Sequence, residues 1–146
     1  MPKVVINRCF GGFSISLEAA RHMAAAGSKR AQLDVADHEK TLLDFAAYKA
    51  TGKVPDGRDD FYGRIWDISI KYDKEPDFHG YGYVNGMDGG YERDDPLLVA
   101  AVEALGKESF GRASELAVVE IPDSVEWEID EYDGKEHIAE KHRTWR

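Results

Sequence analysis

The sequence predicts an α+β fold in a single domain that spans residues 1–146. Three observations carry this prediction: a β-branched run near the N-terminus, helix-like apolar stripes that end near glycines, and a hairpin pattern near the C-terminus. A hydrophobic content of 42% in 146 residues is enough to build one core. We expect about five mostly antiparallel strands, with three helices and a C-terminal β-hairpin.

The N-terminal segment predicts a strand, a glycine turn and a helix. Residues 3–9 contain a β-branched run, which Gly11 and Gly12 interrupt. Ser14 or Ser16 is the expected N-cap of the helix, since a serine oxygen accepts hydrogen bonds from the first free amides. The apolar stripe of this helix and the glycine that ends it are Leu17, Ala20, Met23, Ala24 and Gly27.

The middle of the chain predicts a helix, a strand and a loop. Apolar residues recur on one side of 34–51, with Asp34 or Asp37 as the N-cap. Residues 64–71 alternate between apolar and polar side chains, which is typical of a half-buried strand. Residues 72–93 interleave tyrosines with glycines and are expected to form a long loop, either a recognition loop or a solvated one.

The third predicted helix and the next strand follow this loop. Asp95 as N-cap and Pro96 at the first helical position open the helix, because proline lacks the amide that this position leaves unused. Gly106 or Gly111 is expected to end it. The nearly all-apolar residues 116–121 predict a strand in the centre of the sheet.

The last segment predicts a β-hairpin. Apolar residues alternate with acidic ones up to Asp133-Gly134, which is a turn sequence of the I′ kind. Pairing through this turn gives one apolar pair and two charge-compatible pairs, which support the register, whereas the pair of Trp127 with Glu140 does not. The predicted pairs are Ile129 with Ile138, Glu126 with Lys141 and Asp130 with His137.

The net charge of −9 comes from the second half of the chain. Residues 1–60 carry nine Lys/Arg against eight Asp/Glu, and residues 61–146 carry ten against twenty. The negative electrostatic field of this half disfavours direct binding to nucleic acid or to an anionic membrane. It suits either solubility or the binding of a partner protein with a basic surface. The candidate partner-binding residues cluster on the predicted hairpin: Glu126, Glu128, Asp130, Glu131 and Asp133.

A strand, a glycine pair and a helix start form a frame that often binds anions, because free amides and the helix dipole converge there. Glycine pairs also make ordinary turns, and the flanking phenylalanines can stack on a base or fill the core. If the last strand lies beside the first, the basic and aromatic residues of the C-terminal segment lie close to this candidate anion site. The candidate residues for a nucleotide-like ligand are Arg8, Phe10, Gly11, Gly12, Phe13, Ser14, Arg143 and Trp145.

The remaining chemistry-bearing residues predict no metal, no cofactor and no catalytic group. The histidines lack helical i,i+4 spacing, and Cys9 is the only cysteine. Cys9 lies near a helix start, where a thiolate is stabilised, but an inert core thiol is the favoured interpretation. The sequence has neither an apolar run of about 18 residues nor a signal-peptide pattern, so we expect a cytoplasmic protein without a membrane span.

Three stretches of the chain resemble a family of small accessory proteins encoded by tailed bacteriophages and prophages. They are the opening VINRCFGGFS, the middle DDPLLVAAVEALG and the closing EWEIDEYDG with EKHRTW. The resemblance implies a protein made in the cytoplasm of the bacterial host, and it carries no catalytic residue over to this chain.

The expected function is that of a non-enzymatic phage accessory protein. It binds and antagonises a host component, with immune defence as one possible target, through its acidic surface. Two alternatives stay open: a nucleotide-binding sponge that uses the strand-GlyGly-helix pocket, and a small enzyme that uses Cys9. A homo-oligomer is compatible with each of them.

Overall fold

The structure, a computed structural model, describes residues 1–55, 61–78, 80–81 and 90–141. Its helices are α1 (Leu17–Ala25), α2 (Lys29–Thr51), α3 (Phe61–Tyr72), α4 (Pro96–Leu105) and the short 3-10 helix η2 (Gly106–Ser109). Its strands are β1 (Lys3–Asn7), β2 (Ser14–Ile15), β3 (Gly80–Tyr81), β4 (Leu116–Glu120), β5 (Trp127–Tyr132) and β6 (Lys135–Glu140). The pairs β1–β4, β2–β3 and β5–β6 are all antiparallel, and this confirms the α+β class.

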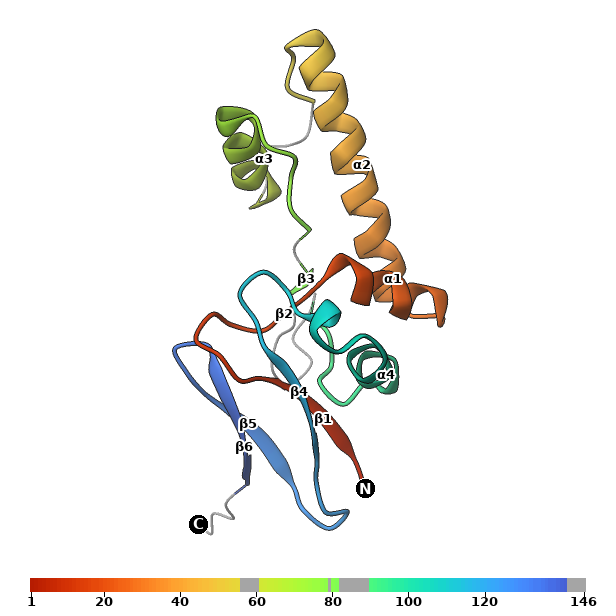
Figure 1. The fold of residues 1–146 in the computed structure, drawn as a ribbon, viewed down its shortest axis with the longest axis vertical. Helices are drawn as coiled ribbons and strands as arrows, with labels where there is room; N and C mark the ends of the chain where they lie inside the picture. Colours follow the sequence, from red (N-terminus) through yellow and green to blue (C-terminus); the bar gives the residue numbers. More distant parts are fainter. Residues whose placement is uncertain (56–60, 79, 82–89, 142–146) are drawn as a thin grey trace, which may run out of the picture.

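Three layers stack in the lower part of the molecule (Figure 1). The β1–β4 pair lies in the middle, with the β5–β6 hairpin on one side and α4 on the other. Successive side chains of a strand point to opposite faces, so β1 supplies both interfaces. Val4 and Ile6 pack against the hairpin, whereas Val5 packs against the helices.

Two apolar clusters hold these layers together. The larger one joins α1 and α4 to β1 and β4, and the smaller one joins the hairpin to the opposite face of the same strands. Fully buried members of the larger cluster are Val5, Ile15, Ala19, Ala20, Met23, Ala31, Leu98 and Ala101; the smaller cluster has Val4, Ile6, Ile121 and Ile129 at its centre.

Several sequence predictions are confirmed. The first strand, the helix capped by Ser16 and the helix opened by Asp95 and Pro96 form where expected, and Gly106 follows the last of these. The hairpin has the predicted register, with Ile129 opposite Ile138. Asp133 (φ 50°) and Gly134 (φ 87°) both have positive φ, as a type I′ turn requires.

The prediction for residues 64–71 is wrong, because this segment belongs to helix α3. Trp66 is only 2% exposed and packs edge-to-face against Phe45 and Tyr48 of α2, at centroid distances of 5.7 and 6.3 Å. Ile68, which a strand would place on the same face as Trp66, is 58% exposed. The packing of Trp66 against α2 therefore outweighs the strand-like alternation of this segment, and the segment is helical.

The predicted start of the second helix is also wrong. Helix α2 begins earlier, at Lys29, because Ser28 is its N-cap and accepts a hydrogen bond from the Ala31 amide at 3.3 Å. Gly27, with φ of 105°, lets the chain turn sharply between α1 and α2. We call α2 and α3 together the arm, because they extend away from the three layers (Figure 1).

Two further predictions need correction. Residues 116–121 predict a strand in the centre of a sheet, but within the described residues β4 pairs with β1 alone and lies at an edge. The expected loop over residues 72–93 contains the two-residue strand β3, which pairs with β2, while residues 79 and 82–89 lie outside the described part. No helix in the described ranges has both the length and the apolar character needed to cross a membrane.

Candidate functional site

The turn of the hairpin docks onto the Gly11-Gly12 pair. A Cβ atom added to Gly134 would overlap the backbone nitrogen of Gly12, and a Cβ added to Gly11 would overlap the carbonyl of Ala113. Three segments far apart in the sequence therefore meet here backbone to backbone, which only glycines allow. The hairpin turn of this same chain lies against the backbone of the glycine pair that predicted an anion cradle, and Gly11 itself stays exposed.

We call the place where the Gly11-Gly12, Ala113 and Gly134 segments meet the junction. Asn7, at the end of β1, forms hydrogen bonds at this junction. Its side chain is fully buried, and its amide donates to the carbonyls of Gly134 and Cys9, each at 2.8 Å. Its side-chain oxygen accepts from the Glu115 amide at 2.9 Å. A buried amide with its donors and acceptor satisfied fixes one geometry, so Asn7 holds the hairpin turn in place.

A buried ion pair lies beneath the junction. The guanidinium of Arg93 donates to both carboxylate oxygens of Glu136, at 2.6 and 2.8 Å, and the two side chains are 2% and 3% exposed. Glu136 also accepts from the backbone N–H of Asn7 at 2.7 Å. Arg93 lies over the ring of Phe13 at 3.5 Å from its centroid, which covers one face of that ring.

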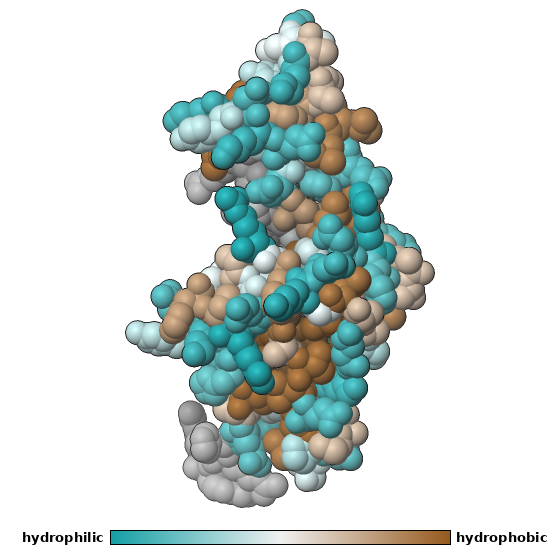
Figure 2. All heavy atoms as spheres, viewed as in Figure 1, coloured by the Kyte–Doolittle hydropathy of each residue, from teal (hydrophilic) through white to brown (hydrophobic). Residues whose placement is uncertain are grey.

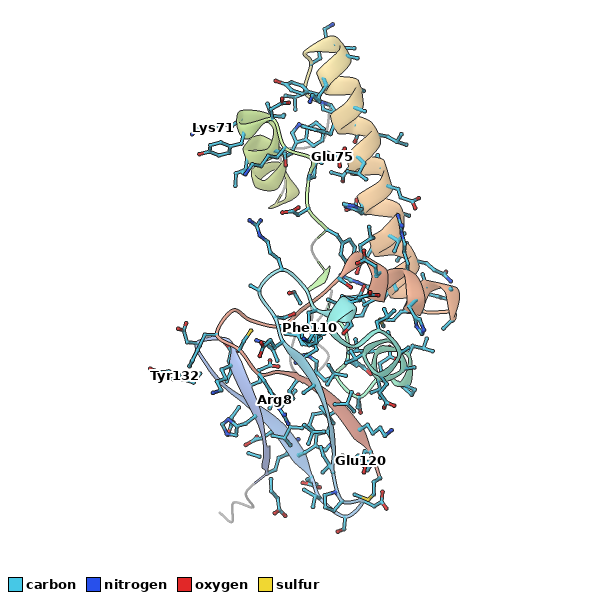
Figure 3. The ribbon with its side chains drawn as sticks, viewed as in Figure 1. Arg8, Lys71, Glu75, Phe110, Glu120 and Tyr132 are labelled. Carbon is cyan, nitrogen blue, oxygen red and sulfur yellow. The ribbon has the colours of Figure 1, made fainter. Side chains whose placement is uncertain are left out.

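Above this framework two aromatic rings are exposed side by side. Phe10 is 62% exposed and Tyr132 is 78% exposed, and their rings meet edge-to-face at 6.5 Å. The ammonium of Lys135 lies 5.4 Å from the Phe10 centroid. Figure 3 shows Tyr132 at the outer edge of the molecule, at the end of the hairpin. We call Phe10, Glu131, Tyr132, Asp133 and Lys135 the hairpin tip.

The candidate partner-binding acids fall into two groups. Glu126, Glu128 and Asp130 share the outward face of the hairpin, since strand residues two apart lie on one face. This face is not uniformly acidic, because Asp130 lies 3.5 Å from His137 across the strands. Glu131 and Asp133 belong to the hairpin tip instead, and the Glu131 carboxylate accepts from the Gly134 amide at 3.0 Å.

The candidate ligand-binding residues do not gather into one pocket. Arg8 and Phe10 are exposed, whereas Phe13 is 8% exposed and packs in the core beneath Arg93. Strand β2 separates the glycine pair from the start of α1, so the glycine amides are not at a helix N-terminus. Ser14 uses its backbone carbonyl to accept from Ser114 at 2.8 Å. Arg143 and Trp145 lie outside the described residues.

Cys9 has a hydrogen-bonded place in the junction. Its thiol donates to the Ala113 carbonyl at 3.1 Å and contacts the Asn7 side-chain oxygen at 3.3 Å. Both contacts orient the sulfur toward backbone and amide oxygens of the framework. Among the described residues, no group of three or more His, Cys, Asp or Glu side chains is arranged to hold a metal ion.

A separate cleft of about 810 Å³ lies between the arm and the layers. Arg112 and Asp77 face each other there in an exposed ion pair of 2.9 Å. None of the candidate residues from the sequence lines this cleft. Its lining consists of Ile68, Ser69, Tyr72, Lys74, Glu75, Asp77, Phe78 and Arg112.

Five residues of the site are absent from the candidates that the sequence predicts: Asn7, Arg93, Tyr132, Lys135 and Glu136. Tyr132 and Lys135 flank the turn as a cross-strand pair, and their outward direction follows from the hairpin register. Asn7 gave no signal, because its role depends on a turn at the other end of the chain.

No protein-family model, no curated protein and no solved structure matches this chain.

Proposed function

We propose that this chain is a binding protein that recognises a basic surface of a partner protein with its hairpin tip. The observation that carries the proposal is the contact between Phe10 and Tyr132. Two large rings, from opposite ends of the chain, are brought together in solvent at 62% and 78% exposure. Aromatic neighbours that are mostly exposed contribute little to folding, and aromatic residues supply much of the binding energy of protein interfaces.

The framework beneath the hairpin tip supports recognition by a preformed surface. Gly134 is packed onto the glycine pair, and Asn7 binds both the turn at Gly134 and Glu136 of β6. A surface that is already ordered loses little conformational entropy when a partner binds. The rings of Phe10 and Tyr132 are therefore suited to act as anchors.

The charge around the hairpin tip indicates the chemistry of the partner. Residues 126–141 contain seven Asp/Glu and two Lys, and Arg93 neutralises one of these acids, Glu136. The field at the hairpin tip is therefore negative, which attracts a basic surface and speeds its association.

The resemblance to accessory proteins of tailed bacteriophages indicates where the partner occurs. A phage protein made in the host cytoplasm meets host proteins, and a basic groove that binds nucleic acid fits an acidic, aromatic surface. Occupation of that groove would exclude the nucleic acid and so antagonise the host component.

The first experiment places a photo-crosslinking amino acid at Tyr132 and expresses the protein in a bacterial host. We expect a discrete crosslinked host protein at this position. The matched control places the same group at Ser124, which is exposed in the turn at the opposite end of the hairpin. Equal crosslinking at both positions, or none at Tyr132, would contradict the proposal.

A charge-reversal variant tests the acidic field separately. Glu128→Lys and Asp130→Lys change positions of β5, Glu126→Lys changes the residue before it, and all three leave the positive-φ residue Asp133 untouched. We expect the loss of the crosslink at Tyr132 with an unchanged circular dichroism spectrum. Asp37→Lys, Glu39→Lys and Asp123→Lys form a control with the same change in net charge on other exposed acids, and this control should keep the crosslink.

A further inference from the structure

Strand β4 has a hydrogen-bonding edge that faces away from β1. The Arg8 amide donates to the Glu115 carbonyl at 2.8 Å, and the Ile121 amide donates to the Pro2 carbonyl at 2.9 Å. These bonds fix the alternation of the ladder, so the odd-numbered residues of β4 bond to β1. The amides and carbonyls of Leu116, Val118 and Glu120 therefore point to the other side.

Within the described part of the chain, these outward groups have no strand and no side chain as a hydrogen-bond partner. Most proteins protect such an edge with charged side chains, proline or a bulge. The sequence of β4, Leu-Ala-Val-Val-Glu, has one charged residue, Glu120 at its end, and no proline. Figure 2 shows a hydrophobic patch on the viewed face over β4, between α4 and the hairpin. Among the described residues this edge is thus unpaired, and Glu120 is its one charged residue.

We propose that a second copy of this chain pairs with β4 at this edge. The two β4 strands run antiparallel about a two-fold axis through Val118, and they join two β1–β4 pairs into one four-stranded sheet. Closed two-fold symmetry is the most common arrangement of homo-oligomers, and an antiparallel pairing of one strand with itself satisfies it. This inference does not depend on the proposed function of the hairpin tip.

The register at Val118 is self-complementary. Val118 lies opposite Val118 of the second copy, and Leu116 lies opposite Glu120, so no like charges meet. The outward amides and carbonyls of these residues then form a ladder of about six hydrogen bonds. Val118 is only partly buried in one chain, so the β-branched pair gains contact area on association.

The two-fold axis also places the equivalent layers of the two copies on the same sides of the joined sheet. A two-fold axis perpendicular to the sheet places both α4 helices on one face and both hairpins on the other. Each copy already covers these faces of its own β1–β4 pair. The extended sheet therefore exposes no new apolar face, and the free edges of two chains are both removed.

Hydrogen exchange measured over a range of protein concentrations tests this pairing in the unmodified protein. We expect the amides of Leu116, Val118 and Glu120 to become at least about tenfold more protected as the protein dimerises. The amides of Ala117 and Val119 bond to β1 in each single chain, so they are the internal control and should stay protected throughout. Native mass spectrometry should show a species of twice 16.4 kDa.

The variant Val118→Pro removes one outward amide without removing a hydrogen bond to β1, which an edge strand tolerates. We expect a folded monomer by circular dichroism and native mass spectrometry. Val118→Thr keeps the amide and the β-branched shape, and it should remain a dimer. A wild-type monomer at all concentrations would overturn the proposal, as would a dimer in which protection of Val118 does not change with concentration.

Discussion

Arg93 and Glu136 form a bidentate ion pair in the interior, and their side chains are 2% and 3% exposed. Arg93 comes from the segment before α4, and Glu136 comes from β6, so the pair connects the helical side of the molecule to the hairpin. Glu136 also accepts a hydrogen bond from the backbone N–H of Asn7 in β1 at 2.7 Å. One carboxylate therefore joins three parts of the fold beneath the hairpin tip.

The variant Glu136→Ala should destabilise the protein strongly. It leaves the Arg93 guanidinium buried without its carboxylate, and the loss of one partner of a buried pair costs about 3–5 kcal/mol. Urea unfolding measures the change in the free energy of unfolding. The control is Asp130→Asn, which removes the carboxylate from the exposed pair with His137 and should change stability by less than about 1 kcal/mol. Equal effects of both variants would contradict the role assigned to Glu136.

The variant Gly134→Ala tests the docking of the hairpin turn. Gly134 has φ of 87°, and a Cβ there would overlap the backbone of Gly12. We expect a loss of about 3 kcal/mol or more in the free energy of unfolding, because strain and steric overlap add. Gly52→Ala is the control: its φ is 72°, but a Cβ there has no atom within 4 Å, so strain alone costs about 1–2 kcal/mol. Similar losses would show that the close approach is unimportant.

The hairpin could be predicted from sequence because its signals are local. Asp133-Gly134 specifies the turn, and the turn fixes the register on both sides. Likewise, Ser16 and Asp95 cap their helices with their own side chains. Each of these elements depends on residues that are close in sequence, so no knowledge of the tertiary structure was required.

The errors have a tertiary origin. Residues 64–71 have a strand-like alternation, but Trp66 packs on α2 and forces a helix. The glycine pair predicts an anion cradle, but the hairpin turn that contacts its backbone is encoded at the other end of the chain. Phe10 and Phe13 flank the same glycines, and nothing local distinguishes the exposed ring from the buried one.

Tyr91 predicts a loss of stability at high pH. Burial, and then the hydrogen bond that its hydroxyl donates to Asp34, raise the pKa of Tyr91 above its ordinary value of 10.0. The folded chain thus holds this proton more tightly than the unfolded chain, so the stabilisation is complete below pH 10 and falls as pH rises further.

The measurement for Tyr91 is the free energy of unfolding at about pH 9 and about pH 11. The wild type should lose about 1 kcal/mol more than Tyr91→Phe over this interval, since one pH unit is worth 1.4 kcal/mol per proton. Tyr132→Phe controls for the removal of a hydroxyl from an exposed tyrosine and should follow the wild type. A Tyr91→Phe variant with the same pH dependence as the wild type would refute this assignment.

The two phenylalanines beside the glycine pair should differ sharply when each is replaced by serine. Phe13 is 8% exposed beneath Arg93, so Phe13→Ser should lower the free energy of unfolding by about 3–5 kcal/mol. Phe10 is 62% exposed, so Phe10→Ser should cost less than about 1 kcal/mol and instead abolish the crosslink from Tyr132 to the partner. Urea unfolding and the crosslinking yield separate these effects. A Phe10→Ser variant that keeps full crosslinking would remove Phe10 from the binding surface, because its loss would then affect neither folding nor recognition.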